Sequence, residues 1–134
     1  MVDLLSVQRR LALLADHRAR LAALSRLDLS EYLQRAYEAR YLVQVCAQLC
    51  IDLANHIIAD AGWAAARDQR DAFARLVEQG LLEAPLAARL QSLVGLRNRL
   101  VHVYDDIDDL LVRDALAEGL PDLDAFARMV AGLA

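Results

Sequence analysis

Apolar residues recur along the chain at the spacing of one helix face. Over residues 3–24 the recurring positions are Leu4, Val7, Leu11, Leu14 and Leu21. Intervals of three, four or seven residues place side chains on one side of an α-helix. Neither an alternating strand pattern nor an Asn-Gly hairpin signal occurs in the sequence. The pattern therefore predicts a helix over residues 3–24 and, for the chain as a whole, helices without a sheet.

Capping signals set the limits of a second predicted helix. Asp28 or Ser30 can cap its start, and a glutamate three residues after Asp28 fits a capping box. Gly62 is a natural residue for its C-terminal end. We therefore predict a helix over residues 31–61, which at 1.5 Å per residue would be roughly 45 Å long. A helix of this length would be the spine of the domain.

Glycine and proline divide the second half of the chain. A third helix is predicted over about 69–79, ending at Gly80, and a fourth from the stretch "EAPLAARLQSL" to about residue 103, with Pro85 in its first turn. Further helical segments are predicted over 107–118, ending at Gly119, and from Pro121 and Asp122 to about residue 132. With no linker or repeat, we predict one all-α domain, residues 1–134, folded as an antiparallel helical bundle.

Composition adds an expectation about assembly and limits the contacts with nucleic acid. Hydrophobic residues make up 57% of the chain (a count that includes Tyr and omits Gly), above the usual level of about 45–50%. A small bundle has limited interior for this apolar surface, which favours a homodimer.

The formal net charge is −4, so the protein is not a strongly basic nucleic-acid-coating protein. Any contact with RNA must therefore be local.

The most apolar segment, "YLVQVCAQLCIDLANHIIA" at residues 41–59, is long enough to span a bilayer. A polar stripe interrupts it at every fourth residue, at Gln44, Gln48, Asp52 and His56. We therefore predict a bundle helix and no membrane contact. The start "MVDLLSVQRR" lacks the pattern of a signal peptide, so a cytoplasmic location is expected.

The polar stripe has two interpretations. We favour a seam of hydrogen bonds between helices. The alternative is that Asp52 or His56 orients the residues of a functional site elsewhere in the fold.

Cys46 and Cys50 lie four residues apart within the same predicted helix. A disulfide would have awkward geometry there, because helical neighbours diverge from the required Cβ approach. We interpret both cysteines as reduced core residues. A metal site with His56 lacks a convincing fourth ligand, so no metal and no cofactor are predicted.

The stretch "GLRNRLVHVYDDIDD", residues 95–109, carries the candidate chemistry. On a helix each residue advances by about 100°. Asn98 and His102 therefore share one face, while Arg97 and Tyr104 share another. Arg97 and His102 diverge by about 140°. To act on one ligand, they need either a distorted helix near His102 or two copies of the chain that meet across a two-fold axis.

An imidazole and a guanidinium together suit metal-independent cleavage of RNA. The imidazole of His102 can take the proton of a 2′-hydroxyl, which then attacks the neighbouring phosphorus. The guanidinium of Arg97 can stabilise the charge that develops on the phosphorus oxygens. The simpler alternative is that both cations only stabilise the C-terminal end of a helix, with Tyr104 as a core or interface aromatic.

The motif "RNRLVHVY" resembles the Arg-x4-His-x-Tyr motif of HEPN proteins, in which a polar residue often follows the arginine. The chain from about residue 30 to its end resembles the HepT-like toxins more specifically. The stretches "CIDLANHIIADAGW", "GLRNRLVHVYDDID" and "LPDLDAFARMV" carry this resemblance. It implies a HEPN-type bundle that acts as the toxin ribonuclease of a toxin–antitoxin module.

The resemblance also implies a role for each motif residue. Arg97 and His102 would be the catalytic pair of an RNA endonuclease at a homodimer cleft, and Asn98 would support them. Tyr104 would be the residue to which a partner, a minimal nucleotidyltransferase antitoxin, transfers AMP. This modification would neutralise the toxin, since the AMP adds an anion and a bulky base beside the cleft.

The aspartates that follow the motif, Asp105, Asp106, Asp108 and Asp109, have three interpretations. We favour a solvated turn with an N-cap for the helix after Ile107. The others are a docking surface for a basic region of the antitoxin and a weakly supported metal site. For the whole protein, the rivals to a nuclease are a non-catalytic nucleotide- or partner-binding helical dimer and a purely structural dimer.

Overall fold

A computed structural model describes residues 3–102 and 104–133, apart from the side chain of Tyr104. Every regular element in this part of the chain is helical, which confirms the all-α prediction. The elements are α1 (Leu4–Ser25), α2 (Leu29–Gln34), α3 (Ala36–Ala61), α4 (Gln69–Glu78), α5 (Ala84–His102), the 3₁₀ turn η1 (Tyr104–Asp106) and α6 (Asp109–Leu133).

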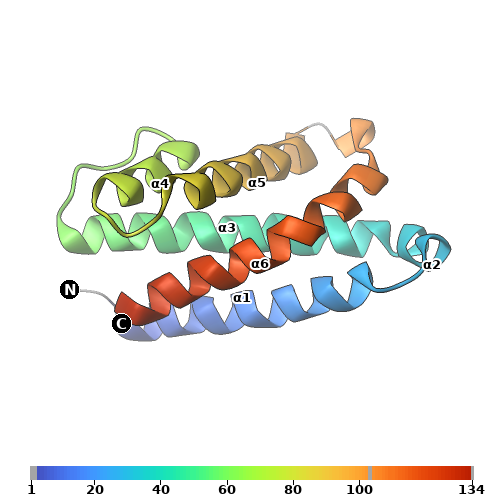
Figure 1. The fold of residues 1–134 in the computed structure, drawn as a ribbon, viewed down its shortest axis with the longest axis horizontal. Helices are drawn as coiled ribbons and strands as arrows, with labels where there is room; N and C mark the ends of the chain where they lie inside the picture. The colour runs from blue at the N-terminus through green and yellow to red at the C-terminus, as the bar shows by residue number, and fades with distance from the viewer. Residues whose placement is uncertain (1–2, 103, 134) are drawn as a thin grey trace.

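The long helices form an antiparallel bundle around α3. In Figure 1, α1, α3, α5 and α6 run in alternating directions along the long axis, and the chain termini lie at the same end. The short helices α2 and α4 are connectors between these long ones. α3 contacts α1, α4, α5 and α6, so the helix predicted as the spine is the centre of the domain.

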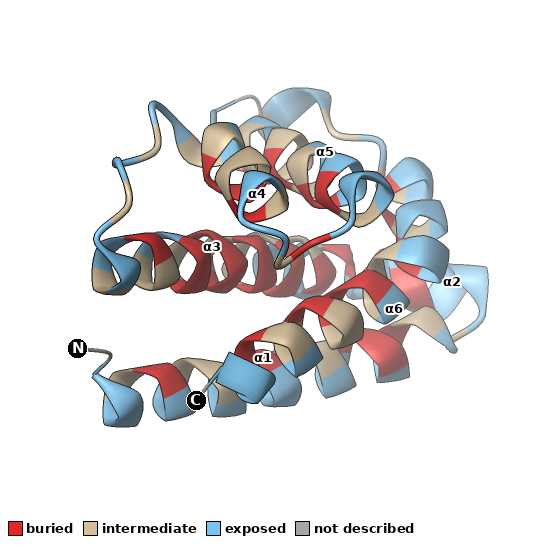
Figure 2. Ribbon diagram, turned by 60° about the vertical axis from the view of Figure 1, so that its left-hand side comes forward, coloured by how far each residue is buried: buried red, intermediate tan, exposed pale blue. Residues whose placement is uncertain are grey.

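Central packing accounts for the apolar character of α3. This helix is long and apolar enough to cross a membrane by length and composition, but 61% of its most apolar window is buried inside the fold. Figure 2 shows buried residues along most of its length. Ala39, Cys46, Leu53 and Ala54 are fully buried, so the apolar positions are used for contacts with the neighbouring helices.

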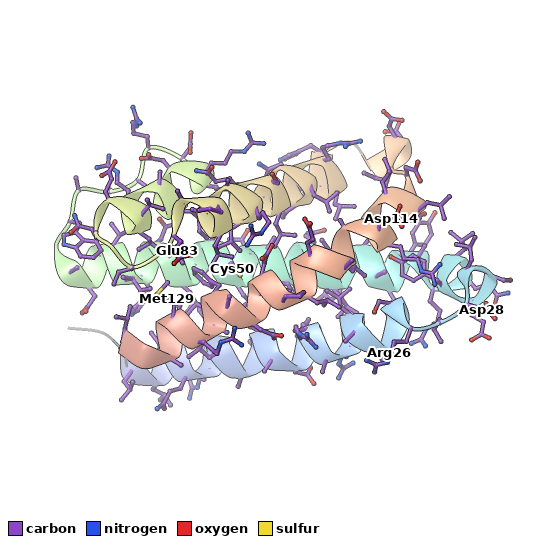
Figure 3. All side chains as sticks on the ribbon, in the orientation of Figure 1. Arg26, Asp28, Cys50, Glu83, Asp114 and Met129 are labelled. Carbon is purple, nitrogen blue, oxygen red and sulfur yellow. The ribbon has the colours of Figure 1, made fainter. Side chains whose placement is uncertain are left out.

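The helix ends follow the sequence signals closely. Asp28, labelled in Figure 3, caps α2 by accepting a hydrogen bond from the Glu31 amide at 2.9 Å. Gly62 and Gly80 follow α3 and α4 with φ of 74° each, a left-handed conformation that glycine adopts without a steric penalty. These local capping and stop signals act as predicted.

The prediction of one helix over residues 31–61 is wrong at a single point. Arg35, with φ of −113° and ψ of 21°, separates α2 from α3. Arg113 of α6 holds α2 in its own direction, because its guanidinium lies 5.4 Å from the Tyr32 ring centroid and donates a hydrogen bond to the Leu27 carbonyl. The break follows from these tertiary contacts, and the spacing of apolar residues does not change across it.

The prediction of separate helices over 107–118 and 121–132 is also wrong. α6 is continuous from Asp109 to Leu133, with Pro121 inside it. The apolar stripe continues across the predicted break, through Val112, Leu116, Leu123, Phe126 and Val130, all of them buried. Pro121 itself is exposed. Packing of this stripe outweighs the local cost of a proline. Proline has no backbone N–H, so it cannot donate the helical hydrogen bond to the carbonyl four residues earlier.

Replacing Pro121 with alanine tests the continuity of α6. We expect Pro121→Ala to raise the free energy of unfolding by about 1–3 kcal/mol, because a helix-interior proline costs about 3 kcal/mol relative to alanine. Urea denaturation measures the change. Pro85→Ala is the matched control, since Pro85 lies in the first turn of α5, where proline is tolerated. Equal, small effects of both substitutions would mean that Pro121 also begins a helix.

Candidate functional site

The candidate site is built on the last turns of α5. The core-facing stripe of this helix contains Ala87, Leu90 and Val94, and Arg97 is the next position at helical spacing. Arg97 is therefore half-buried, whereas His102, the last residue of the helix, is exposed. The same periodicity that anchors α5 in the core thus turns the guanidinium inward and the imidazole outward.

Asn98 orients the guanidinium of Arg97. The Nη1 of Arg97 donates a hydrogen bond of 2.9 Å to the Oδ1 of Asn98. The Nε of Arg97 is buried, and no described residue accepts a hydrogen bond from it. A buried donor of this kind is costly unless a partner satisfies it. Asn98 therefore orients the guanidinium. The donors that remain for an anionic group from outside are those of Nη2, which is not buried and makes no hydrogen bond to a described residue.

Asn98 and His102 line an open hollow of about 600 Å³ on the outer face of α5, together with Arg70, Ser92, Gly95, Leu96 and Arg99. Arg97 is not among its lining residues. Within one chain, Asn98 thus contacts the Arg97 guanidinium and shares the hollow with His102, but the arginine and the histidine stay on different faces. Because α5 is helical from Ala84 to His102, distortion of these residues does not bring the pair together.

The structure places the backbone of Tyr104 at the start of η1, two residues beyond His102. The side chain of Tyr104 lies outside the part of the chain that the structure describes. Its predicted role as the AMP acceptor therefore stays a prediction, supported by its position next to the end of α5.

The aspartates after the motif have separate structural roles. The Oδ1 of Asp108 accepts hydrogen bonds from the amides of Leu110 and Leu111, at 3.0 and 3.4 Å, and so caps α6 as predicted. Asp109 binds Arg40 of α3 through two hydrogen bonds of 2.7 and 2.8 Å. Asp105 and Asp106 are exposed.

All four aspartates line a second hollow, of about 560 Å³, together with Leu33, Arg99 and Leu110. Among the described residues, no group of three or more His, Cys, Asp or Glu side chains is placed to hold a metal ion. Arg99 lies at the border of both hollows, so it separates a basic surface from an acidic one.

The polar stripe of α3 is partly satisfied within its own helix. The Nε2 of Gln48 donates a 2.8 Å hydrogen bond to the Oδ1 of Asp52. No hydrogen bond in the described part of the chain joins Asp52 or His56 to Arg97. The alternative that Asp52 or His56 orients Arg97 within one chain thus gains no support.

Cys46 and Cys50 are free thiols in the core, as predicted. Cys50 lies near the middle of α3 (Figure 3). Burial raises the pKa of the Cys46 thiol to about 12, and burial next to Cys46 raises the pKa of Cys50 as well. The reactive thiolate form is therefore disfavoured at both positions.

Arg70 and Arg99 line the hollow beside His102, although neither was predicted as a site residue from the sequence. Arg70 comes from α4, and only the packing of α4 against α5 brings it to the hollow. The one local signal is Gly95, a glycine inside a helix, which often marks the close approach of another group. Arg99 lies within the motif, but its position between the two hollows depends on the turn that follows α5.

Comparison with known proteins gives consistent matches. The family described as "Ribonuclease HepT-like" matches residues 9–130. The mRNA nuclease HepT of Shewanella oneidensis is 33% identical over 88 residues, which are 66% of this chain and 66% of that protein. The tRNA nuclease HepT of Aphanizomenon flos-aquae is 29% identical over 127 residues, 92% of this chain and 86% of the relative.

A solved structure of a tri-AMPylated Shewanella oneidensis HEPN toxin in complex with an MNT antitoxin has the same fold. It superposes with a TM-score of 0.87 at 26% identity, over 98% of this chain and 99% of the other. The likeness therefore covers nearly the whole chain.

Proposed function

Because the chain belongs to the HepT-like ribonuclease family, we propose that it is the RNA-cleaving toxin of a toxin–antitoxin module, with Arg97 and His102 as its catalytic pair. The observation that carries this assignment is the arrangement at the end of α5. Asn98 accepts a hydrogen bond from Arg97, and an exposed histidine on a different face of the same helix lines a basic hollow. These groups suit a reaction at a phosphodiester.

In the proposed reaction, His102 takes the proton from a 2′-hydroxyl of RNA. The 2′-oxygen forms a bond to the adjacent phosphorus, and the bond from phosphorus to the 5′-oxygen breaks. A water molecule gives a proton to the leaving 5′-oxygen, and the proton held by His102 passes to the resulting hydroxide. The products are a 2′,3′-cyclic phosphate and a 5′-hydroxyl. The Arg97 guanidinium donates hydrogen bonds to the phosphorus oxygens, whose negative charge is greatest in the transition state.

The reaction requires two copies of the chain, and the geometry of α5 is the reason. A regular helix keeps Arg97 and His102 about 140° apart, so one chain cannot direct both at one phosphate. A two-fold axis beside α5 would place the arginine of one subunit next to the histidine of the other. A homodimer is thus part of the proposal.

Exposed apolar side chains at this end of the bundle support such a dimer. Along α2 and α3 they recur every fourth residue, at Leu29, Leu33, Tyr37 and Tyr41, with exposed fractions between 43% and 80%. Leu110 and Leu111 at the start of α6 are 46% and 61% exposed. Leu33 and Leu110 line the same hollow as Arg99 of the motif helix, so this apolar surface adjoins the site.

The proposed control of the enzyme is AMP transfer by a minimal nucleotidyltransferase antitoxin. The Tyr104 hydroxyl attacks the α-phosphorus of ATP, and pyrophosphate leaves. The AMP phosphodiester, attached two residues beyond His102, adds an anion close to the end of α5 and competes with the RNA phosphate. The presence of AMP on the Shewanella oneidensis toxin bound to its MNT antitoxin supports this proposal. RNA and ATP are both cytoplasmic, so we propose that the protein acts in the cytoplasm.

Cleavage of RNA by the purified protein tests the catalytic pair. We expect cleavage that persists in EDTA and falls at least about 100-fold in His102→Ala and in Arg97→Ala, since both groups act on the transition state. Arg20→Ala, which removes an exposed arginine of α1, is the matched control and should cleave normally. Wild-type rates in His102→Ala would refute the assignment. Intact RNA together with measurable nucleotide affinity would favour a non-catalytic binding module.

Replacing Tyr104 with phenylalanine tests the site of modification. We expect Tyr104→Phe to cleave RNA at the wild-type rate, because the hydroxyl has no role in the reaction, but to gain no AMP adduct when incubated with the antitoxin and ATP. Mass spectrometry detects the adduct. The exposed tyrosines Tyr37 and Tyr41 provide controls, and their phenylalanine variants should be modified normally. Normal neutralisation of Tyr104→Phe would assign the control to another residue.

A further inference from the structure

Arg70 reaches the face of the catalytic helix from α4. It lies in the first turn of α4, and its backbone carbonyl accepts a 3.0 Å hydrogen bond from the Nε2 of Gln91, which ties this turn to α5. Its guanidinium lies directly over Gly95: a Cβ at Gly95 would be 2.6 Å from the Nη2 of Arg70. The absence of a side chain at Gly95 is what lets the guanidinium lie against α5.

The hollow that Arg70 enters carries positive charge without a carboxylate. Arg70, Arg99 and His102 line it, together with neutral residues. Neither Arg70 nor Arg99 makes an ion pair within the part of the chain that the structure describes. In contrast, ion pairs with Asp or Glu are made by Arg18, Arg20, Arg35, Arg40, Arg67, Arg75 and Arg89.

The two hollows that share Arg99 differ in charge. One side of Arg99 opens to the basic hollow, and the other opens to the hollow with four aspartates. On a chain with a net charge of −4, an unpaired cluster of guanidinium groups is a local attractive site for an anionic polymer. A phosphate chain that leaves His102 is drawn toward Arg70 and repelled by Asp105 and Asp106.

We propose that Arg70 and Arg99 bind phosphates of the nucleotides that flank the cleaved one, so that the RNA strand lies across the α4–α5 face. This inference rests on the proposed function and adds a binding site to it. The hollow, at about 600 Å³, is within the size range of ligand sites. Guanidinium contacts to phosphate oxygens fix position without reading sequence, so the site contributes affinity for RNA of any sequence.

The test measures binding to an RNA oligonucleotide whose 2′-hydroxyls are all methylated, because this probe cannot undergo the proposed attack. Fluorescence anisotropy gives the Kd at a series of salt concentrations. Arg70→Ala should weaken binding about five- to tenfold. It should also reduce the slope of log affinity against log salt by about 0.7, the value for one phosphate contact on a single strand. Arg20→Ala carries the same change in net charge on α1 and should bind like the wild type.

A second variant changes the position of Arg70 without removing its charge. In Gly95→Ala, the new Cβ displaces the guanidinium, so we expect a smaller loss of affinity than in Arg70→Ala. The same substitution in an Arg70→Ala background should cause no further loss, because both changes act on one contact. Alanine also favours a helix over glycine, so thermal unfolding should show that the loss of affinity is not a loss of fold.

Failure of this inference is distinguishable from failure of the proposed function. If the wild type cleaves RNA but Arg70→Ala keeps the wild-type Kd and salt slope, the phosphate site is refuted and the nuclease assignment stands. If Arg70→Ala binds RNA normally but no longer binds the antitoxin, the face is a protein-docking surface and the inference is wrong. A wild type that neither binds nor cleaves RNA refutes both proposals.

Discussion

The regular geometry of α5 is the constraint on which the account of this protein depends. The helix is unbroken from Ala84 to His102, and each residue advances it by about 100°. Arg97 therefore follows the core-facing stripe, whereas His102 faces solvent. The two groups of the proposed chemistry thus lie on different faces of one helix. Asn98 accepts a hydrogen bond from Arg97 and lines the same hollow as His102.

The rest of the bundle fixes this geometry. α3 lies at the centre and contacts α1, α4, α5 and α6. The bundle side of α5 is anchored by apolar residues, and its outer face is joined to α4 by the hydrogen bond from Gln91 to the Arg70 carbonyl. The Arg40–Asp109 pair joins α3 to the start of α6 just beyond the motif. Arg99, near the end of α5, lines both the basic and the acidic hollow.

Local signals in the sequence predicted the fold class and most helix ends, because caps and stop residues act over only a few positions. Asp28, Gly62 and Gly80 behave as their residue types suggest. The errors arose where tertiary contacts override such signals. Pro121 remains inside α6 because buried residues on both sides of it continue one stripe. The break at Arg35 depends on Arg113, which is distant in sequence.

The motif residues could be chosen from sequence because their types and spacing are themselves the signal. The helical repeat predicted that Asn98 and His102 share a face that Arg97 does not, and both of them line one hollow that Arg97 does not line. The predicted face shared by Arg97 and Tyr104 stays a prediction, because α5 ends at His102. Arg70 could not be found in this way, since its contribution depends on the packing of α4 on α5. In the same way, composition predicted an excess of exposed hydrophobic surface, but not that Leu33, Tyr37, Tyr41, Leu110 and Leu111 would be exposed at the motif end of the bundle.

Mixing two inactive variants tests whether a single active site is built from two subunits. Arg97→Ala and His102→Ala are each purified, unfolded together and refolded as mixed dimers, and RNA cleavage is compared with that of each variant refolded alone. A mixed dimer contains one intact pair, with Arg97 from one chain and His102 from the other, so the account predicts that activity returns to a substantial fraction of the wild-type rate. Mixed dimers as inactive as their parents would show that both groups must come from the same chain, which would contradict the account.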